Sequence, residues 1–307
     1  MSETPEVNAP VSRCGFVAVL GAPNAGKSTL VNRAVGQKVS IVSPKVQTTR
    51  SRVLGIVTEG ATQLVLIDTP GIFAPRRRLD RAMVAAAWGG ASDADAVVLI
   101  VDAARKGIED ETRNIIAGLK KQNRKAILAL NKIDIVKREK LLALTAELNA
   151  EGVFTDIFMI SAETGDGVDD LLQVLAARMP EGPHHFPDDQ VTDAPMRSLA
   201  AEVTREQLFR QLQQELPYAL TVETDSWEEF DDGSAKIQQT IFVERDSQKA
   251  IVVGKGGSRV KEVREAAQRE LQEMMDRKVH LFLFVKVREN WAEDPERYRA
   301  LGLDWKA

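Results

Sequence analysis

The chain is short of cysteine, of long apolar stretches and of signals for export. Its 307 residues include one cysteine, Cys14, so no intramolecular disulfide can form and the sequence suits a reducing compartment. No apolar run approaches the roughly 20 residues that cross a bilayer. The first dozen residues lack the basic and then apolar pattern of a signal peptide. We therefore expect a cytoplasmic protein without a transmembrane segment; these absences leave peripheral membrane contact open.

A surplus of positive charge is also lacking. The chain has 41 basic and 45 acidic residues, a formal net charge of −4. Whole-chain charge of this sign argues mildly against a nucleic-acid partner, although it can hide a local basic patch. Hydrophobic residues make up 44% and charged residues 28%, which is ordinary for a globular protein, and the length allows two domains.

Short apolar runs alternate with amphipathic stretches in the first half of the chain. We expect strands at Phe16–Leu20, Leu64–Ile67, Ala96–Val101, Ala126–Leu130 and Ile157–Ile160, and helices that include Leu30–Val35, Lys140–Asn149 and Val168–Arg178. Strands that are apolar throughout are covered on both faces. Their alternation with helices predicts an α/β fold with a mostly parallel, doubly wound sheet.

A segment with four prolines, PEGPHHFPDDQVTDAP, then interrupts this pattern and reads as a linker. After it we expect a helix at Leu199–Leu216, strands at Ala219–Trp227 and Lys236–Glu244, a glycine turn, a helix at Ser258–Asp276 and a β-rich run at Val279–Val287. This mixed order predicts an α+β domain. The expected boundaries are a flexible N-terminus at 1–13, a first domain at 14–180, a linker at 181–195 and a second domain at 196–307, whose tail with two tryptophans should pack onto the protein.

Residues 21–28, GAPNAGKS, match the phosphate-loop pattern G-x-x-x-x-G-K-[ST]. They follow an expected strand and precede an expected helix, which is the context that the pattern needs. The glycines let backbone N–H groups surround a phosphate, and the helix N-terminus adds partial positive charge. Lys27 would reach the β- and γ-phosphates and the Ser28 hydroxyl would bind Mg²⁺. We expect a triphosphate site here rather than a fortuitous glycine turn.

The motif DTPG, residues 68–71, ends an expected strand at the sheet edge where ligands bind. Asp68 would lie near Mg²⁺, and the Gly71 N–H can approach the γ-phosphate because no side chain blocks it. Between the two motifs, the segment VQTTR offers a threonine that completes the metal shell only while the γ-phosphate is present. We assign this role to Thr49, with Thr48 as the alternative. Taken alone, DTPG is also a good β-turn.

The motif NKID, residues 131–134, follows the fourth expected strand. Guanine presents two adjacent donors, N1–H and N2–H₂, that the Asp134 carboxylate can accept together. Adenine lacks this pair, and a site built for such bonds rejects the analogue on the order of 10⁴-fold. Asn131 would brace the loops, Lys132 would cover the base, and the Ala162 N–H in SAETG would meet guanine O6. Asp134 could also be an ordinary helix N-cap. The order of the motifs along the chain, each directly after an expected strand, favours a guanine-binding role of Asp134 over a helix N-cap.

The set GAPNAGKS, QTTR, DTPG, NKID and SAETG resembles the Era family of translation-factor-related GTPases. The resemblance continues into the second half, where ELPYALTVE (215–223), IVVGKGGS (251–258) and VKVRENW (285–291) are similar to the type II KH domain of that family. It covers the chain from about Cys14 to the C-terminus. It implies a P-loop GTPase domain followed by a KH domain, GTP or GDP with Mg²⁺, binding of small-subunit (16S) ribosomal RNA near its 3′ end, and assistance to assembly of the small ribosomal subunit. We also expect a monomer. Some family members associate with the membrane.

These motifs and the resemblance assign roles to individual residues. The expected nucleotide-binding set is Gly21, Asn24, Ala25, Gly26, Lys27, Ser28, Thr29, Asp68, Gly71, Asn131, Lys132, Asp134, Ser161, Ala162 and Glu163. Within it, Ser28 and Asp68 are expected at the metal together with Thr49. Catalytic roles are expected for Asn24, Lys27, Thr49 and Gly71.

Ile72 follows DTPG, where Ras-like enzymes hold a glutamine that orients the attacking water. Isoleucine has no donor or acceptor, so either hydrolysis is slow or another group stabilises the developing charge. Asn24 resembles the asparagine that helps to bind K⁺ in related potassium-activated GTPases. That ion occupies the place of an arginine finger, so the resemblance implies K⁺-stimulated hydrolysis; the alternative is that Asn24 only shapes the loop.

In the second half, the glycine turn is a G-x-x-G sequence, Gly254, Lys255, Gly256 and Gly257, which precedes an expected helix. In KH domains such a turn clamps about four nucleotides. Between Arg245 and Glu289, eleven basic residues stand against seven acidic ones, opposite in sign to the whole chain. We therefore expect RNA contacts from this turn and from Arg259.

Three function classes remain open at this point. The chain is a regulatory GTPase whose nucleotide state controls RNA engagement, an RNA assembly factor that binds GTP but scarcely hydrolyses it, or another P-loop enzyme that acts on RNA. Asp134 argues against ATP, and the KH-like half argues against the tRNA-modification GTPases. We favour the first class.

Overall fold

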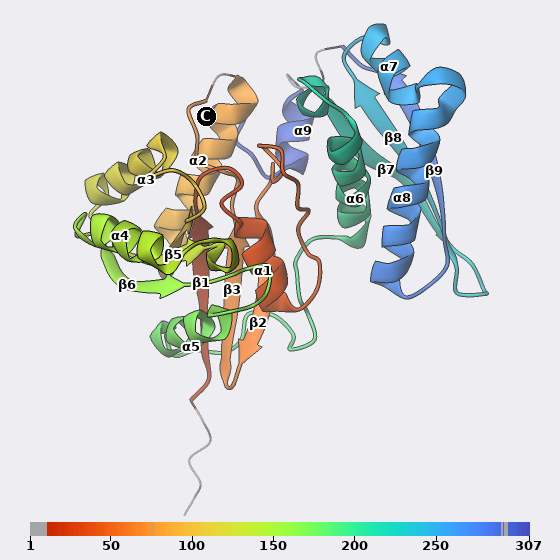
Figure 1. The fold of residues 1–307 in the computed structure, drawn as a ribbon. Helices are drawn as coiled ribbons and strands as arrows, with labels where there is room; N and C mark the ends of the chain where they lie inside the picture. Colours follow the sequence, from red (N-terminus) through yellow and green to blue (C-terminus); the bar gives the residue numbers. More distant parts are fainter. Residues whose placement is uncertain (1–10, 76, 290, 292–293) are drawn as a thin grey trace, which may run out of the picture.

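The computed structural model describes residues 11–75, 77–289, 291 and 294–307. Most of the expected flexible N-terminus, and Asn290 of the VKVRENW motif, lie outside the described residues. Figure 1 shows a domain with a large sheet beside a smaller domain with its own sheet. The order of elements agrees with the α/β domain followed by an α+β domain that the sequence predicts.

The first domain is built on a six-stranded sheet of order β2-β3-β1-β4-β5-β6. The strands are β1 (Arg13–Leu20), β2 (Val53–Glu59), β3 (Thr62–Asp68), β4 (Ala96–Asp102), β5 (Ala126–Asn131) and β6 (Phe154–Met159). All neighbours pair in parallel except β2 and β3, which are antiparallel. The five expected strands are present, with ends shifted by a few residues.

Strand β2 is absent from the sequence-based expectation. Its sequence VLGIVTE contains a glycine and two polar residues, so it lacks the continuous apolar character of a central strand. It lies at the edge of the sheet and joins β3 by a tight turn, where Gly60 has φ of +59°. An edge strand pairs with one neighbouring strand only, so its sequence does not need to be apolar throughout. The sequence pattern that would predict β2 is therefore weaker than that of the central strands.

Five helices cover the two faces of this sheet (Figure 1). They are α1 (Lys27–Val35), α2 (Arg78–Asp93), α3 (Asp110–Lys121), α4 (Arg138–Asn149) and α5 (Val168–Arg178), with a 3₁₀ turn at Ile133–Ile135. Helices α2, α3 and α4 pack in one apolar cluster, and α1 and α5 in the other. Along β1, Ala18 and Leu20 join the first cluster while Val17 and Val19 join the second, which is the two-sided burial that a parallel strand requires.

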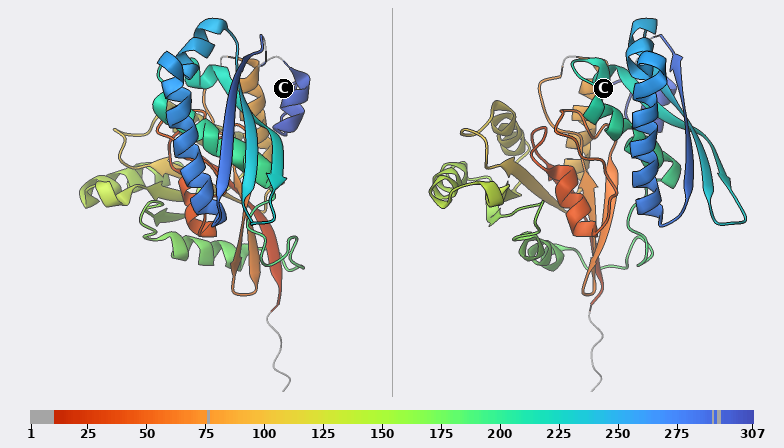
Figure 2. Two further views of the ribbon diagram at one scale, coloured as in Figure 1. Left: turned by 90° about the vertical axis from the view of Figure 1, so that its right-hand side faces the viewer. Right: turned by 45° about the vertical axis from the view of Figure 1, so that its right-hand side comes forward.

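The second domain has a three-stranded sheet of order β7-β8-β9, with β7 antiparallel and β9 parallel to β8. Its elements are α6 (Met196–Gln211), β7 (Leu220–Glu229), β8 (Ala235–Val243), α7 (Asp246–Val253), α8 (Ser258–Met275), β9 (Val279–Val287) and α9 (Pro295–Ala300), with 3₁₀ turns at Leu216–Ala219 and Lys255–Gly257. Apolar residues of α6 and α8 pack against this sheet. Figure 1 shows α6 between α8 and the first domain, and Figure 2 shows the same two domains from two further directions.

Two sequence-based expectations need correction here. The helix expected at Leu199–Leu216 ends at Gln211, because Leu212 is extended and Gln214 has φ of +56°, just before a 3₁₀ turn begins at Leu216. Helix α7 was not expected, and it contains the apolar run that precedes the glycine turn.

The C-terminal tail packs onto the first domain. Tyr298 and Leu303 are buried against Leu79 and Met83 of α2, and Trp305 packs at the edge of the same cluster. This contact confirms the expectation that the tail packs onto the protein. Within the described residues, no helix is both long and apolar enough to cross a membrane.

Candidate nucleotide and RNA sites

The phosphate loop connects β1 to α1 at the carboxyl edge of the sheet. Gly26 has φ of +105°, and an added Cβ would lie 2.2 Å from the side-chain nitrogen of Asn131, so this position requires glycine. The Lys27 side chain folds back over the loop, where Nζ donates to the carbonyl oxygens of Gly21 (3.3 Å) and Ala22 (3.0 Å). Burial lowers the pKa of Lys27 to about 8, and the Asp68 carboxylate opposes this shift. The loop therefore holds a buried amine among backbone amides, which is suited to phosphate.

A cavity of about 350 Å³ lies at this edge of the sheet. Its lining includes thirteen of the expected nucleotide and metal residues, Asn24, Gly26, Lys27, Ser28, Thr29, Thr49, Gly71, Asn131, Lys132, Asp134, Ser161, Ala162 and Glu163. Three expected residues do not line it. Gly21 and Ala25 lie in the loop wall and offer carbonyl oxygens to neighbours, and Asp68 is buried behind hydroxyl groups. The structure thus brings together motifs that lie more than 100 residues apart in sequence.

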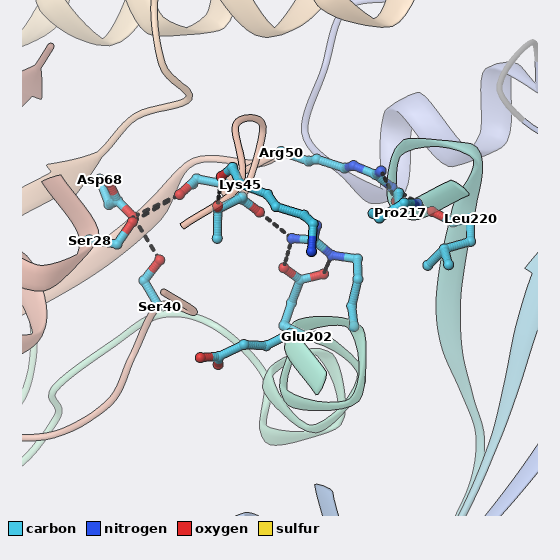
Figure 3. A network of polar contacts seen from close by, with 12 residues as sticks. Ser28, Ser40, Lys45, Arg50, Asp68, Glu202, Pro217 and Leu220 are labelled. Atoms are coloured by element: carbon cyan, nitrogen blue, oxygen red, sulfur yellow. Dashed lines mark hydrogen bonds and ion pairs between the residues drawn. The ribbon is translucent and has the colours of Figure 1, made fainter. Parts of the chain in front are cut away.

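Asp68 is the centre of the candidate metal site. Its Oδ2 accepts hydrogen bonds from Ser28 Oγ (2.7 Å), Thr49 Oγ1 (3.2 Å) and Ser40 Oγ (2.7 Å), as Figure 3 shows for Ser28 and Ser40. The side chain is fully buried, and its Oδ1 atom has no hydrogen-bond partner. Burial raises the pKa of Asp68, while the three hydroxyls and Lys27 lower it.

The donor set fits a hard cation. Mg²⁺ prefers oxygen ligands and is usually held by one or two carboxylates together with substrate phosphates. Ser28, Thr49 and Asp68 offer only oxygen, and Asp68 Oδ1 is an orphaned acceptor. In the described part of the chain, no three His, Cys, Asp or Glu side chains gather into a cage of their own. Ser40 was missed from the sequence, because a serine in a polar loop carries no motif.

The two threonines of the QTTR motif have different surroundings. Thr49 Oγ1 lies 3.0 Å from Ser28 Oγ and is buried. Thr48 Oγ1 instead donates to the Lys45 carbonyl at 2.8 Å, and the Thr48 carbonyl accepts from Arg205. Thr49 Oγ1 therefore lies with the oxygen atoms of Ser28 and Asp68, whereas Thr48 Oγ1 does not.

Gly71 and Ile72 follow β3 next to the phosphate loop. A Cβ at Gly71 would lie 3.1 Å from Pro23, so the absent side chain lets the two loops approach. The Ile72 N–H donates to the Gly21 carbonyl at 3.2 Å, and its side chain is buried in the apolar cluster of α2 and α3. Ile72 therefore points away from the cavity and cannot orient a water there.

Asn24 joins the phosphate loop to the segment that follows α1. It has φ of +64°, and its Nδ2 donates to the Pro44 carbonyl at 2.8 Å. Both residues line the cavity. This contact places a side-chain amide and the Pro44 carbonyl together on the cavity wall. Their oxygen atoms are neutral ligands of the kind that a monovalent cation would use.

The base-reading motifs meet at the other end of the cavity. Asn131 is buried, and its Nδ2 donates to the Ala25 carbonyl at 2.9 Å while its Oδ1 accepts from the Ala162 N–H at 2.9 Å. Lys132 has φ of +68°, and its Nζ forms an ion pair with Asp102 at 2.7 Å. Asp134 is exposed on the cavity rim, in the 3₁₀ turn that follows β5. The Asn131 side chain thus joins the phosphate loop to the SAETG loop through these two hydrogen bonds.

The candidate RNA site is the turn between α7 and α8. Gly254, Gly256 and Gly257 have φ of +73°, +60° and +81°, conformations that L side chains rarely adopt. A Cβ at Gly256 would meet nothing within 4 Å, so the turn presents bare backbone to solvent. Lys255 is exposed beside it, and Arg259 donates to the Ile251 carbonyl at 3.1 Å from the first turn of α8. The turn is therefore open to close approach by a nucleic-acid backbone.

Comparison with known proteins agrees with both halves of this geometry. A family model described as 50S ribosome-binding GTPase matches residues 16–132, and a KH domain model matches residues 215–292. The chain is 58% identical to GTPase Era of Afipia carboxidovorans over 98% of this chain and 97% of the relative. It is 60% identical to GTPase Era of a Bradyrhizobium strain over 96% of this chain and 95% of the relative.

Solved structures give the same result. The crystal structure of a point variant of Aquifex aeolicus Era bound to GDP·AlF₄⁻ matches with a TM-score of 0.88 and 37% identity, and covers 94% of this chain and 99% of that one. A crystal structure of Era in complex with MgGDPNP and nucleotides 1506–1542 of 16S ribosomal RNA has the same TM-score and identity, over 95% of this chain and 99% of that one. With such identity over nearly its whole length, this chain belongs to the GTPase Era family and is a GTPase with a P-loop domain followed by a KH domain.

Proposed function

We propose that this GTPase is a switch that binds small-subunit ribosomal RNA and assists assembly of the small ribosomal subunit. The observation that carries the proposal is the presence, in one chain, of the nucleotide cavity and the open G-x-x-G turn. Support comes from the related Era that was solved with MgGDPNP and nucleotides 1506–1542 of 16S ribosomal RNA, which this chain matches over 95% of its length. The proposed divisions are a first domain at 14–180, a linker at 181–195 and a second domain at 196–307.

In the proposed nucleotide site, Lys27 holds the β- and γ-phosphates, and the Gly71 N–H donates to the γ-phosphate. The hydroxyl oxygens of Ser28 and Thr49 would bind Mg²⁺ directly. Asp68 lies behind these hydroxyls and would accept hydrogen bonds from the ligands of the metal. The bound metal would neutralise charge that develops on the phosphate oxygens during hydrolysis. Thr49 would take part only while the γ-phosphate is present, which makes its loop the sensor of nucleotide state.

For the base, Asp134 would accept N1–H and N2–H₂ of guanine while Asn131 keeps the two loops together. Lys132 would cover the base from its position beside Asp102. For RNA, the backbone of Gly254, Gly256 and Gly257 would admit the chain of nucleotides closely, and Lys255 and Arg259 would contact phosphates.

Hydrolysis requires a group that replaces the water-orienting glutamine, because Ile72 is buried in the core. We propose that K⁺ supplies positive charge beside the triphosphate, with Asn24 among its ligands. The support is the position of Asn24 next to the Pro44 carbonyl on the cavity wall. A monomeric state, a cytoplasmic location and peripheral membrane contact stay predictions.

The test of the RNA proposal is crosslinking in cells followed by sequencing of the bound RNA, with the purified chain compared in parallel in GDP and in a GTP analogue. Enrichment of the 3′ region of small-subunit ribosomal RNA is the expected result. Enrichment of transfer RNA or messenger RNA instead would overturn the proposed partner while leaving the GTPase assignment intact.

A further inference from the structure

The segment between α1 and β2, residues 36–52, contains no helix or strand, yet it carries Thr49, the residue that we propose as the metal sensor. Thr49 and Arg50 are nonetheless 7% and 4% exposed. A buried irregular backbone needs partners for its polar groups from elsewhere in the protein. One such partner is Arg205 of α6, which donates to the Thr48 carbonyl. In addition, the side chains of Lys45 and Arg50 donate to the carbonyls of Phe209 and Leu220 in the second domain.

Arg50 extends out of the first domain into the second (Figure 3). Its Nη1 donates to the carbonyl of Leu220 at 2.7 Å, and its Nη2 donates to the carbonyls of Pro217 and Tyr218 at 3.3 Å each. These three carbonyls belong to the 3₁₀ turn that leads into β7 and to the first residue of that strand. A single guanidinium therefore fastens the residue next to Thr49 to a fixed turn of the second domain.

Two aromatic rings complete the surroundings of this guanidinium. Its central carbon lies 5.8 Å from the ring centre of Phe209 on α6 and 5.7 Å from that of Trp291. The Trp291 indole N–H donates to the Ala219 carbonyl at 3.1 Å, so the ring is held by the same turn. Rings of this kind attract a desolvated cation, and only a planar guanidinium can use them together with several carbonyls.

A second arginine, Arg205, extends from the second domain toward the first. Arg205 of α6 is 1% exposed, and its Nη2 donates to the Thr48 carbonyl. Glu202, one turn earlier on α6, forms an ion pair with Arg205. Burial and the charge of Arg205 lower the pKa of Arg50 to about 9, and Glu202 opposes that shift. The residues on both sides of Thr49 are thus held by the second domain, through the Thr48 carbonyl and through the Arg50 side chain.

We propose that Arg50 is a positioning residue for the GTPase reaction, because its anchorage in the second domain sets the place of Thr49 at the metal and γ-phosphate. Arg205 supports the neighbouring Thr48 carbonyl from α6. The inference rests on the proposed role of Thr49. If the inference holds, Thr49 can take its position at the metal only while the KH domain is docked against the first domain. The contacts responsible involve protein groups only.

The physical reason is the precision that a metal ligand needs. A ligand must be held within about 0.5 Å of its productive position by groups that are themselves fixed. Residues 36–52 have no regular structure to supply this rigidity, and ordering such a segment costs conformational entropy. The anchored guanidinium provides that order through contacts within the protein. Since Thr49 is expected at the metal only when a γ-phosphate is present, loss of the anchor should weaken GTP binding and spare GDP binding.

Coupling of this kind is reciprocal. If docking of the second domain favours the triphosphate state, then binding of the triphosphate must favour docking by the same factor. The amide of Leu220 and its neighbours in β7 should therefore exchange with solvent more slowly in the presence of a GTP analogue than in GDP. This readout does not depend on the hydrolysis rate.

The experiment uses the full chain and compares dissociation constants for GDP and for a non-hydrolysable GTP analogue, both with Mg²⁺. In Arg50→Lys we expect the analogue to bind about tenfold more weakly, because lysine keeps the charge but cannot reach three carbonyls at once. GDP affinity should change by less than about twofold. Arg50→Ala should give a larger loss of the same selectivity, with Lys partially restoring it. Arg205→Gln should reproduce the pattern from the other domain.

Arg52→Ala is the matched control, because Arg52 is exposed two residues further along the same segment. It should bind both nucleotides like the parent chain. A merely structural role of Arg50 predicts equal losses for GDP and the analogue together with a lower melting temperature, and that outcome would overturn the inference. Unchanged affinity for the analogue in the folded Arg50→Lys and Arg205→Gln variants would overturn it too.

Thr49→Ala separates this inference from the assignment on which it rests. If Thr49→Ala loses analogue binding selectively while the two arginine variants do not, Thr49 is the sensor and the anchor is irrelevant. If Thr49→Ala binds the analogue as well as the parent does, the proposed role of Thr49 itself is wrong. Selective loss in all three variants is the expected result.

Discussion

The amide hydrogen of Ala162 is donated to the side-chain oxygen of Asn131, at a distance of 2.9 Å between nitrogen and oxygen. The same side chain donates to the Ala25 carbonyl, so one buried amide joins the phosphate loop to the SAETG loop. The sequence predicts that the Ala162 N–H meets guanine O6. In this structure the hydrogen is directed at Asn131, so a contact with O6 requires this bond to be shared or exchanged when the base binds.

Asn131→Ala should therefore weaken GTP and GDP alike. Two hydrogen bonds in a buried position are lost, and each is worth about 0.5–1.5 kcal/mol, so we expect affinities to fall by roughly 10–100-fold. The preference for guanine over adenine should persist, because Asp134 is unchanged. Fluorescence titration with labelled GDP, GTP and ATP measures this, and Asn149→Ala, an exposed asparagine at the end of α4, is the control. A loss confined to GTP would contradict the bracing role.

Asp134→Asn should change which purine the cavity accepts. The amide presents a donor where guanine also presents donors, so GTP affinity should fall on the order of 10⁴-fold, as in sites that reject a mismatched polar partner. Xanthine carries a carbonyl in place of the 2-amino group and can accept from the new amide. We expect XTP to replace GTP as the preferred nucleotide, measured by competition binding.

Because Asp134 is exposed, its substitution should change nucleotide selectivity without changing the stability of the fold. The melting temperature of the nucleotide-free chain should stay within a few degrees of the parent, since surface substitutions usually change stability by about 0.5 kcal/mol or less. Continued preference for GTP over XTP would show that another group reads the base.

The first domain was predictable because its signals are local. Each of β1, β3, β4 and β5 is an apolar run, and three of these runs lead directly into a motif, so strand, loop and chemistry are read in one stretch. Strand β2 and helix α7 carry weaker signals: β2 pairs at a sheet edge, and only Val252 of α7 is buried. The end of α6 depends on the backbone conformation of Leu212 and Gln214, which no periodicity reveals.

The site divides in the same way. Lys27, Asp68 and Asn131 belong to motifs whose spacing fixes their chemistry. Ser40 lies in no motif, and Arg50 ends the QTTR motif without a role that the motif assigns to it. The partners of these two side chains lie 28 and 170 positions away. The meaning of such a residue depends on packing between distant segments, and one sequence contains no pattern that reports it.

Gly256→Asp should abolish RNA binding and leave GTP binding intact. The residue has φ of +60°, which strains any L side chain, and the carboxylate would stand where a phosphate is expected. Filter binding with a 3′-terminal fragment of small-subunit ribosomal RNA measures the first effect, and GDP titration measures the second.

The control for that substitution lies in the same domain. Gly233, in the turn between β7 and β8, has φ of +79° and equally open space around its Cβ position. Gly233→Asp therefore imposes a similar backbone strain and the same charge away from the G-x-x-G turn. If it weakens RNA binding as much as Gly256→Asp does, the turn has no special role.

Potassium should accelerate hydrolysis, and Asn24 should be required for it. An arginine finger in this position contributes about 10³–10⁵ in rate, so a cation that takes its place should raise kcat at least about tenfold when KCl replaces NaCl at constant ionic strength. Asn24→Gly keeps the left-handed backbone at φ of +64° and removes only the side-chain amide, so it should lose the difference between the two salts. Asn123→Gly, at a left-handed asparagine after α3, should keep it. Equal phosphate release in both salts by the parent chain would exclude potassium, and a K⁺ effect that survives in Asn24→Gly would move the ion to other ligands.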